Sequence, residues 1–345
     1  MKLAVLFGGS SNEHEVSVVS ACSIIKNLDK NKYDITPIYL DKKDDFYFWR
    51  KDINEIEPME IGVLPTSLEK IEEPFLTLKN YDCVFLMIHG KNGEDGILAS
   101  ILEFLHIPYV GNKPAPSIIT MDKINTKDIL ECNHIKTSKY QSFMKYNDTY
   151  MYDGKSCSFD EVLKQILEKL SFPMFVKPAN SGSSIGVGKA NDLKELEKAI
   201  QEALRVDERI LVEEMVVGRE VECAILERDG KVEASVVGEV IANDEFYSFD
   251  AKYKNSESKT VIPANIDEED SQQIRNIAKK AFQILNLHSY SRIDFFLTSD
   301  HQVILNEINT IPGFTEISMY PKLWEATGVS YSNLLDSLIV ENIKK

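Results

Sequence analysis

The chain has 345 residues, 43% hydrophobic and 27% charged, as in a folded protein with room for two or three domains. Its formal net charge of −16 argues against a nucleic-acid backbone or an anionic membrane as the main partner. Five cysteines without a Cys-x-x-Cys pair argue against a disulfide framework or a zinc site. The first apolar run, residues 3–7, is too short for a signal peptide, and no later run approaches membrane-spanning length, so we expect a cytoplasmic protein.

Residues 3–7 predict a buried parallel strand, and Gly8-Gly9-Ser10-Ser11 leads into a predicted helix over residues 16–28. This opening is typical of an α/β nucleotide-binding domain. It lacks the G-x-G-x-x-G spacing, so a dinucleotide fingerprint is not supported. The acidic cluster around Glu13 either interacts with the helix dipole or binds a ligand.

Residues 84–88 predict another buried strand, followed by a loop with three glycines that begins at His89. Ligands bind at the carboxyl ends of strands in open α/β sheets, although a flexible loop remains the alternative. A helix is predicted over residues 97–105, and a domain boundary near residue 113.

The middle of the chain predicts a helix over residues 117–130 that carries Lys123, whereas residues 139–160 give no clear pattern. A strand that ends at Lys177-Pro178 leads into a Gly/Ser loop, residues 179–188, whose amides and hydroxyls suit a phosphate. The loop does not match a Walker A motif, and similar loops also occur without ligands.

Residues 249–259 form a long polar stretch, which indicates an active-site lid or plain disorder. Helices are predicted over residues 268–285 and 331–343. Residues 292–315 lie between them and predict two strands around a turn at residues 298–301.

The predicted hairpin carries polar side chains where core residues are expected. A two- or four-residue loop puts Asp294 opposite Leu305 and Arg292 opposite Glu307. All four polar side chains, which are Arg292, Asp294, Glu307 and Asn309, then share one face. Their oxygens suit Mg²⁺ or Mn²⁺. The alternative is a solvated face with one Arg–Glu pair.

Lysines at strand ends, a metal-type carboxylate pair and a Gly/Ser loop without a Walker motif indicate an ATP enzyme of another class. The chain resembles the D-alanine–D-alanine ligases of the ATP-grasp superfamily from Gly8 to near its C-terminus. The shared motifs are Gly8-Gly9-x-Ser11-x-Glu13-x-Glu15-Val16-Ser17, His89-Gly90-x-x-Gly93-Glu94-Asp95-Gly96, Met121-Asp122-Lys123, Lys177-Pro178, Gly182-Ser183-Ser184-x-Gly186, Gly218-Arg219-Glu220, Lys252-Tyr253, Arg292-x-Asp294 and Asn306-Glu307-x-Asn309-Thr310-x-Pro312-Gly313.

The resemblance implies an α/β fold with an α+β C-terminal half, in a three-domain ATP-grasp architecture that begins with a Rossmann-like domain. We expect domains over residues 1–113, 114–212 and 213–345, with ATP between the last two. The resemblance also implies the reaction. The carboxylate of one D-alanine attacks the γ-phosphate of ATP, and the amine of a second D-alanine then displaces phosphate to give the dipeptide for peptidoglycan.

The resemblance assigns roles to individual residues. Two Mg²⁺ or Mn²⁺ ions are expected on Asp294, Glu307 and Asn309. ATP is expected to contact Lys123, Lys177, Ser184, Glu213, Glu214, Met215, Val216, Glu220 and Lys252. The catalytic set is Glu13, Ser183, Tyr253, Arg292 and Gly313, in which Arg292 and the Gly313 amide stabilise an oxyanion. Substrates are expected at Glu13, His89 and Ser318.

Three alternatives stay open at this point. Related ligases take D-serine or D-lactate as the second substrate, although Tyr253 matches the D-alanine type. A non-catalytic nucleotide-binding protein is disfavoured by the two metal carboxylates, and an oxidoreductase by the missing fingerprint. The resemblance also implies a homodimer.

Overall fold

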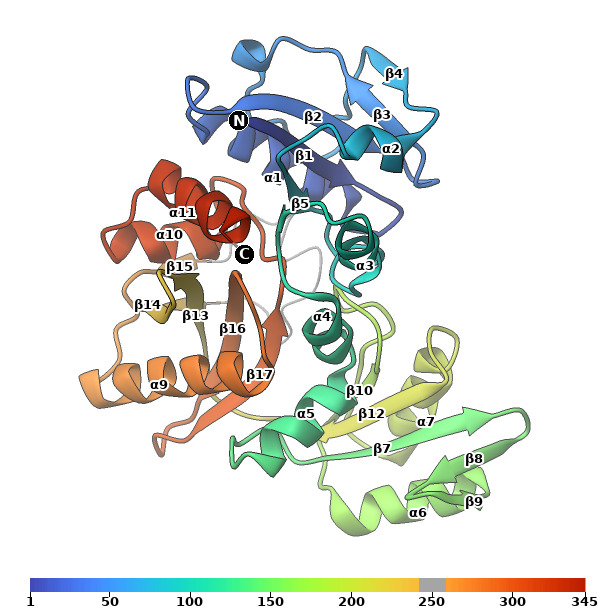
Figure 1. The fold of residues 1–345 in the computed structure, drawn as a ribbon. Coiled ribbons are helices and arrows are strands. Elements are labelled where there is room, and N and C mark those ends of the chain that lie inside the picture. The colour runs from blue at the N-terminus through green and yellow to red at the C-terminus, as the bar shows by residue number, and fades with distance from the viewer. Residues whose placement is uncertain (242–258, 345) are drawn as a thin grey trace.

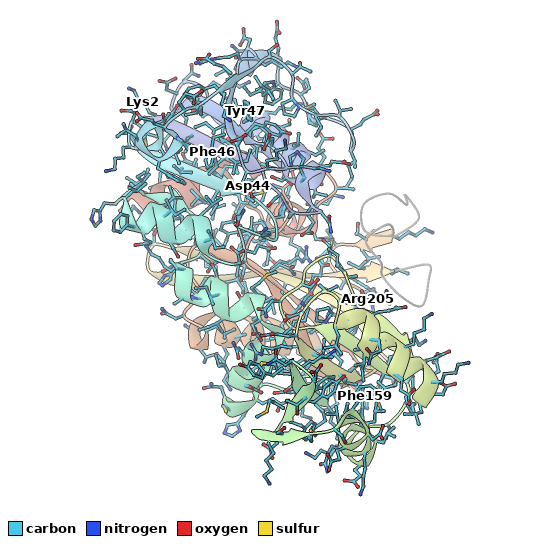
Figure 2. All side chains as sticks on the ribbon, turned by 90° about the vertical axis from the view of Figure 1, so that its right-hand side faces the viewer. Lys2, Asp44, Phe46, Tyr47, Phe159 and Arg205 are labelled. Carbon is cyan, nitrogen blue, oxygen red and sulfur yellow. The ribbon has the colours of Figure 1, made fainter. Side chains whose placement is uncertain are left out.

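The computed structural model describes residues 1–241 and 259–344. Three β-sheets follow one another along the chain, each accompanied by helices (Figure 1). In Figure 2, Lys2 and Tyr47 lie toward one end of the molecule, and Phe159 lies toward the other. The first and second sheets therefore lie at opposite ends, with the third between them. Within the described ranges, no helix is long and apolar enough to cross a membrane.

The first sheet has the strand order β4-β3-β2-β1-β5-β6. The apolar runs predicted as buried strands are β1 and β5, which pair in parallel. Their carboxyl ends lie at one edge of the sheet, so the loops that carry Glu13 and His89 are neighbours. The elements are β1 (Lys2–Gly8), α1 (His14–Asn27), β2 (Asp34–Leu40), β3 (Phe46–Trp49), η1 (Ile53–Glu55), β4 (Leu68–Lys70), α2 (Pro74–Leu78), β5 (Cys83–Met87), α3 (Ile97–Phe104) and β6 (Tyr109–Val110).

The predicted helix over residues 117–130 is wrong as one element, because the chain forms two helices there. α4 (Pro114–Met121) ends one residue before Asp122, and α5 (Lys123–Cys132) begins after it. The Asp122 carboxylate accepts hydrogen bonds from the amides of Ile124 and Asn125, each at 3.0 Å. This N-cap starts a new helix and places Lys123 at its first position.

The second sheet has the order β11-β10-β12-β7-β8-β9 and a core of its own. Residues 139–160, which show no clear pattern in the sequence, contribute its last three strands. The Gly/Ser loop joins β10 to β11 as predicted. The elements are β7 (Tyr140–Tyr146), β8 (Thr149–Tyr152), β9 (Lys155–Cys157), α6 (Phe159–Lys169), β10 (Met174–Pro178), β11 (Gly188–Ala190), α7 (Leu193–Ala203) and β12 (Arg209–Glu214).

The third sheet is antiparallel, in the order β15-β14-β13-β16-β17. The predicted last helix is confirmed as α11, whereas α10 was not predicted. Ile274 and Phe282 of α9 pack on one face of the sheet in a common core. The elements are β13 (Arg219–Arg228), β14 (Lys231–Ile241), β15 (Lys259–Val261), α9 (Glu268–Ile284), β16 (Tyr290–Leu297), β17 (Val303–Asn309), α10 (Met319–Ala326) and α11 (Tyr331–Ile343).

One hydrophobic core joins the first sheet to the other face of the third sheet. It runs from Phe85 in β5 through Phe314 and Tyr290 to Leu335 in α11. The rings of Phe85 and Phe314 lie 6.0 Å apart, centre to centre, in an edge-on arrangement. The N-terminal sheet therefore packs, through Phe314, against Tyr290 at the end of β16 from which the polar face of the hairpin begins.

Candidate active site

The β16–β17 hairpin brings its four polar side chains to one face, as predicted, but in a different register. Asp294 pairs with Glu307, and Arg292 pairs with Asn309. The predicted pairings of Asp294 with Leu305 and of Arg292 with Glu307 are therefore wrong. The loop is one residue longer than the register argument assumed, because Leu297 pairs with Val303.

The longer loop alone would turn the polar side chains of β17 to the opposite face, and a β-bulge restores the predicted face. Phe295 pairs with Leu305 and the next pair is Asp294 with Glu307, so Asn306 is the extra residue. Leu305 and Ile308, three positions apart, are both buried in the α9 core. Without the bulge, strict alternation would have sent Glu307 and Asn309 to the apolar face.

Arg292 is held by two carboxylates on this face. Its Nε and Nη2 donate to Asp294 Oδ1 and Oδ2, each at 2.7 Å, and its Nε lies 2.9 Å from Glu222 Oε2. The side chains of Arg292 and Asp294 are only 17% and 14% exposed, which excludes the solvated-face alternative. Burial alone would lower the pKa of Arg292, but Asp294 and Glu222 raise it well above its ordinary value.

Two lysines converge on Glu213 at the end of β12. Lys177 forms an ion pair with Glu213 Oε1, and Lys127 Nζ lies 3.0 Å from Oε2. Ser138 Oγ also donates to Oε2 at 2.7 Å. Burial alone would raise the pKa of Glu213, but the two lysines hold it well below its usual range. The result is a buried, charged cluster beside the Gly/Ser loop.

The Gly/Ser loop lies between this cluster and the first sheet. Lys123 Nζ donates to the carbonyl oxygen of Ser181. Ser183 and Ser184 both have positive φ, 53° and 58°. A methyl group at Gly182 would stand 3.6 Å from Glu13 Oε2, so the Glu13 carboxylate lies against this loop.

His89 is buried and Glu94 is half-buried where the first sheet meets the loop after β17. His89 Nδ1 lies 2.8 Å from the carbonyl oxygen of Ile311. A carbonyl oxygen only accepts, so Nδ1 carries the proton, and Nε2 is an acceptor in the neutral ring. Burial lowers the pKa of His89, which favours that neutral form. Among the described residues, Nε2 has no hydrogen-bond partner.

Glu94 accepts hydrogen bonds from the amides of Gly90, at 2.9 Å, and Ile311, at 3.3 Å. Burial, together with the negative charge of Glu13, raises the pKa of Glu94 to about 8.

Gly313 and Ser318 lie side by side after the hairpin. A methyl group at Gly313 would stand only 2.7 Å from Ser318 Oγ. That oxygen in turn accepts a hydrogen bond from the Thr315 amide at 2.9 Å.

Of the remaining predicted residues, four lie at the end of β12 or in β13, and two lie outside the described residues. Glu214, Met215 and Val216 follow Glu213 at the end of β12, where Glu214 Oε1 accepts from the Ser171 amide at 2.8 Å. Glu220 lies in β13, opposite Phe296 of β16. Lys252 and Tyr253 lie outside the described residues.

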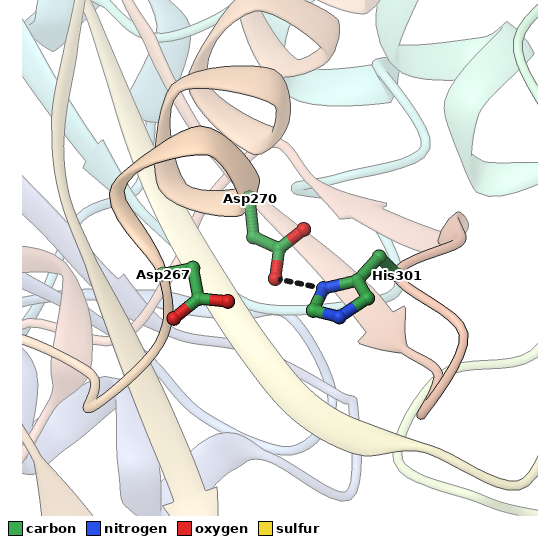
Figure 3. A group of neighbouring side chains, drawn as sticks. All are labelled: Asp267, Asp270 and His301. Carbon is green, nitrogen blue, oxygen red and sulfur yellow. Dashed lines mark hydrogen bonds and ion pairs between the residues drawn. The ribbon is translucent and has the colours of Figure 1, made fainter.

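Another group with metal-ligand chemistry lies at the turn end of the hairpin, away from Asn309. Asp267, Asp270 and His301 have ligand atoms within 4.8 Å of one another (Figure 3). His301 Nδ1 lies 2.8 Å from Asp270 Oδ2, and both aspartates stand at the N-terminus of α9. An ion pair at a helix N-terminus accounts for this group without a metal.

Sequence reasoning missed three contributors to the site. Lys127 was absent from the predicted phosphate lysines, although its place one turn after Lys123 on α5 was a usable signal. Glu222 lies two residues after Glu220 and therefore on the same face of β13. Asn112 Nδ2 donates to the carbonyl oxygens of Tyr290 and Thr310, which are so far away in the sequence that no local signal indicated these contacts.

Two family models match the chain. The model described as D-ala D-ala ligase N-terminus covers residues 2–112, and the model described as D-ala D-ala ligase C-terminus covers residues 129–340. A relative named D-alanine--D-alanine ligase, from Clostridium acetobutylicum, is 42% identical over 339 residues, which are 98% of this chain and 96% of the relative.

Solved structures agree with the sequence matches. The D-alanine-D-alanine ligase of Coxiella burnetii superposes with a TM-score of 0.82 at 33% identity, covering 100% of this chain and 94% of that one. The VanG D-Ala:D-Ser ligase of Enterococcus faecalis has the same TM-score at 32% identity and covers 99% of both chains.

Proposed function

Since this chain belongs to the D-alanine–D-alanine ligase family, with the three-domain ATP-grasp fold, we propose that it joins two D-alanines at the site built around β16 and β17. The first D-alanine is activated by ATP as D-alanyl phosphate, and the second displaces phosphate to give D-alanyl-D-alanine. The observation that carries the assignment of the site is the convergence of Arg292, Asp294, Glu307 and Asn309 on one face.

The oxygen donors on this face fit a hard divalent cation. Asn309 Nδ2 donates to Asp294 Oδ2 at 3.0 Å, so the amide oxygen is the atom available to a cation. Asp294 Oδ1 accepts only from Arg292 among the described residues and keeps a lone pair. We propose that Asp294, Glu307 and Asn309 hold two Mg²⁺ or Mn²⁺ ions, which neutralise charge on the β- and γ-phosphates when bound.

Three lysines supply positive charge for the phosphates of ATP. Phosphoryl transfer depends on position and charge neutralisation more than on covalent help. Lys123 and Lys177 are supported by their places at the Gly/Ser loop and at the end of β10. The assignment of Lys252 to ATP rests on the family motif alone. The amides of the loop and Ser184 would then cover the phosphates.

The base and ribose are assigned to the end of β12 and the start of β13. The residues concerned are Glu213, Glu214, Met215, Val216 and Glu220. Because Glu213 is already bonded to Lys127 and Lys177, its carboxylate would orient both lysines while its backbone meets the base.

Glu13 is assigned to the ammonium group of the first D-alanine. Its carboxylate lies against Gly90 and Gly182, which are the two loops that would border the substrate. His89 Nε2 offers an acceptor on the same side. Ser183 and Tyr253 complete the family's hydrogen-bonded set, and Ser183 Oγ, without a partner among the described residues, supports that assignment.

The second step places negative charge on the carbonyl oxygen of the D-alanyl group. Arg292 and the Gly313 amide are assigned to stabilise it, a contribution worth about 3 kcal/mol per donor. Ser318, next to Gly313, is assigned to the carboxylate of the second D-alanine.

We also propose domains over residues 1–113, 114–212 and 213–345. Each range holds one sheet, except that β12 continues to Glu214. A cytoplasmic location is supported by the free thiols of all five cysteines. A homodimer is supported by α3, where Ile97 and Phe104 are 48% and 83% exposed although the opposite side of the helix is also apolar.

The deciding experiment measures phosphate release and dipeptide formation together. Phosphate release that requires both ATP and D-alanine, with one dipeptide per phosphate, supports the proposal. ATP hydrolysis that is indifferent to D-alanine would contradict it. Competing D-alanine, D-serine and D-lactate as second substrate tests the D-alanine assignment, and a preference for either of the other two would overturn it.

A further inference from the structure

Three of the five residues after β17, in the segment 310–314, are hydrogen-bonded to side chains from residues 1–113. Asn112 Nδ2 donates to the carbonyl oxygen of Thr310 at 3.2 Å. Glu94 accepts from the Ile311 amide, and His89 is bonded to the Ile311 carbonyl. Ser20 Oγ accepts from the Phe314 amide at 3.2 Å. This segment contains Gly313 and begins directly after Asn309.

Asn112 makes an unusual set of contacts. The same Nδ2 also donates to the carbonyl oxygen of Tyr290 at 2.7 Å, and Oδ1 accepts from the His288 amide at 2.7 Å. Tyr290 begins β16, and Thr310 follows the last residue of β17. The side chain, only 3% exposed, therefore bridges the two strands just beyond their last pair, Arg292 with Asn309.

These contacts connect two parts of the proposed site. Glu13, assigned to the first D-alanine, is fixed by loops of the N-terminal sheet. Asn309, Arg292 and the Gly313 amide belong to the hairpin and its continuation. Of the four side chains that link the two, Asn112 and Glu94 bond to the Thr310–Ile311 backbone and are not themselves assigned to a substrate, so they help to set where the Gly313 amide stands relative to the first substrate.

We propose that Asn112 and Glu94 are positioning residues for the amide-forming step, because they hold the Thr310–Ile311 backbone and through it the Gly313 amide. This inference rests on the proposed function. In that step the amine nitrogen bonds to the carbonyl carbon, the bond from that carbon to the phosphate oxygen breaks, and phosphate leaves as the nitrogen loses a proton.

A displaced Gly313 amide slows that attack without preventing formation of the acyl phosphate. Water then competes: its oxygen bonds to the same carbon, and D-alanine and phosphate are released without dipeptide. The ratio of phosphate to dipeptide therefore reports positioning. Partial unfolding lowers both products equally and leaves the ratio unchanged.

The test measures this ratio at saturating ATP and D-alanine for the wild type, Asn112→Ala, Asn112→Asp and a control. Asn112→Asp keeps the acceptor for His288 but loses both donor bonds. The control, Asn342→Ala, loses two partly buried hydrogen bonds, to Ser289 Oγ at 2.9 Å and to Leu338 O at 2.7 Å, neither of which involves residues 310–314.

We expect a ratio near one for the wild type and Asn342→Ala, and a rise of about 10-fold for both Asn112 variants, which is below the roughly 100-fold cost that a 1 Å misplacement can carry. A ratio that stays near one in folded Asn112 variants overturns the inference. If neither variant folds, Glu94→Gln decides, because Gln offers one acceptor oxygen for two amides. A wild type that makes no dipeptide would instead refute the proposed function.

Discussion

Asp294 and Glu307 face each other across β16 and β17 as a directly paired couple, and Asn306 is the extra residue that makes this pairing. The pairing places two carboxylates on the same face of the sheet, while the opposite face of both strands is apolar.

Glu307→Gln should leave the fold intact and reduce kcat by about 100-fold or more, because a neutral amide loses several kcal/mol of charge stabilisation at a metal. Steady-state kinetics across Mg²⁺ concentrations and a urea denaturation curve check both parts. Glu233→Gln is the matched control and should keep wild-type activity, because Glu233 lies in β14 and is bonded to Arg228 of β13, at the turn that joins these strands. Near-normal turnover of Glu307→Gln would remove the metal assignment.

Gly313→Ala should raise the KM for the second D-alanine, because its methyl group would stand 2.7 Å from Ser318 Oγ and force that side chain to move. The double variant Gly313→Ala, Ser318→Ala should be no worse than Ser318→Ala alone, since the clashing oxygen is then absent. Additive losses in kcat/KM would show that Gly313→Ala acts by another route.

Lys127→Met should lower the free energy of unfolding by about 3 kcal/mol, the low end for breaking a buried ion pair, because Lys177 still faces Glu213. Lys127 and Glu213 are 4% and 5% exposed at their side chains, so water does not replace the lost partner. Lys198→Met, which removes an exposed pair with Glu202, is the control and should change stability by less than about 0.5 kcal/mol. Urea unfolding distinguishes the two.

Glu94 should make the protein less stable as the pH rises from 4.5 to 8. Burial raises the pKa of Glu94 in the folded state to about 8 from 4.5, so over this window the native state holds a proton that the unfolded chain has lost. Stability therefore falls with pH. In Glu94→Gln the decline in urea midpoint across the window should be smaller, and an identical slope would contradict the buried-carboxyl account.

His301 should titrate above the ordinary value for histidine, because its hydrogen bond to Asp270 favours the charged ring and raises its pKa. The stability from this pair is complete below the unfolded-state pKa and is lost as the pH rises through the folded pKa. NMR titration of the ring should show the pKa falling in Asp270→Asn but not in Asp34→Asn. No change in Asp270→Asn would rule out the ion pair.

Local sequence pattern was sufficient to identify several parts of the fold and one loop of the site. The apolar run at residues 3–7, the last helix and the Gly/Ser loop depend on neighbours within a few residues, where periodicity and turn chemistry act. The convergence of the four hairpin residues was predicted correctly, yet for a reason that needed correction. A longer loop and a bulge at Asn306 each shift the register by one residue in the same direction, and a total shift of two residues returns the side chains to the predicted face.

The sequence by itself determined the family, the chemistry of the hairpin and the type of most elements. Only the tertiary structure decided the break at Asp122, the pairing of Lys127 with Glu213, and the bridge from Asn112 to Thr310. Asn112 and Thr310 are 198 residues apart, so no local preference links them. Their contact exists because the first and third sheets share one core. Polar groups that this core buries need hydrogen-bond partners, and Asn112 and Thr310 provide them for each other.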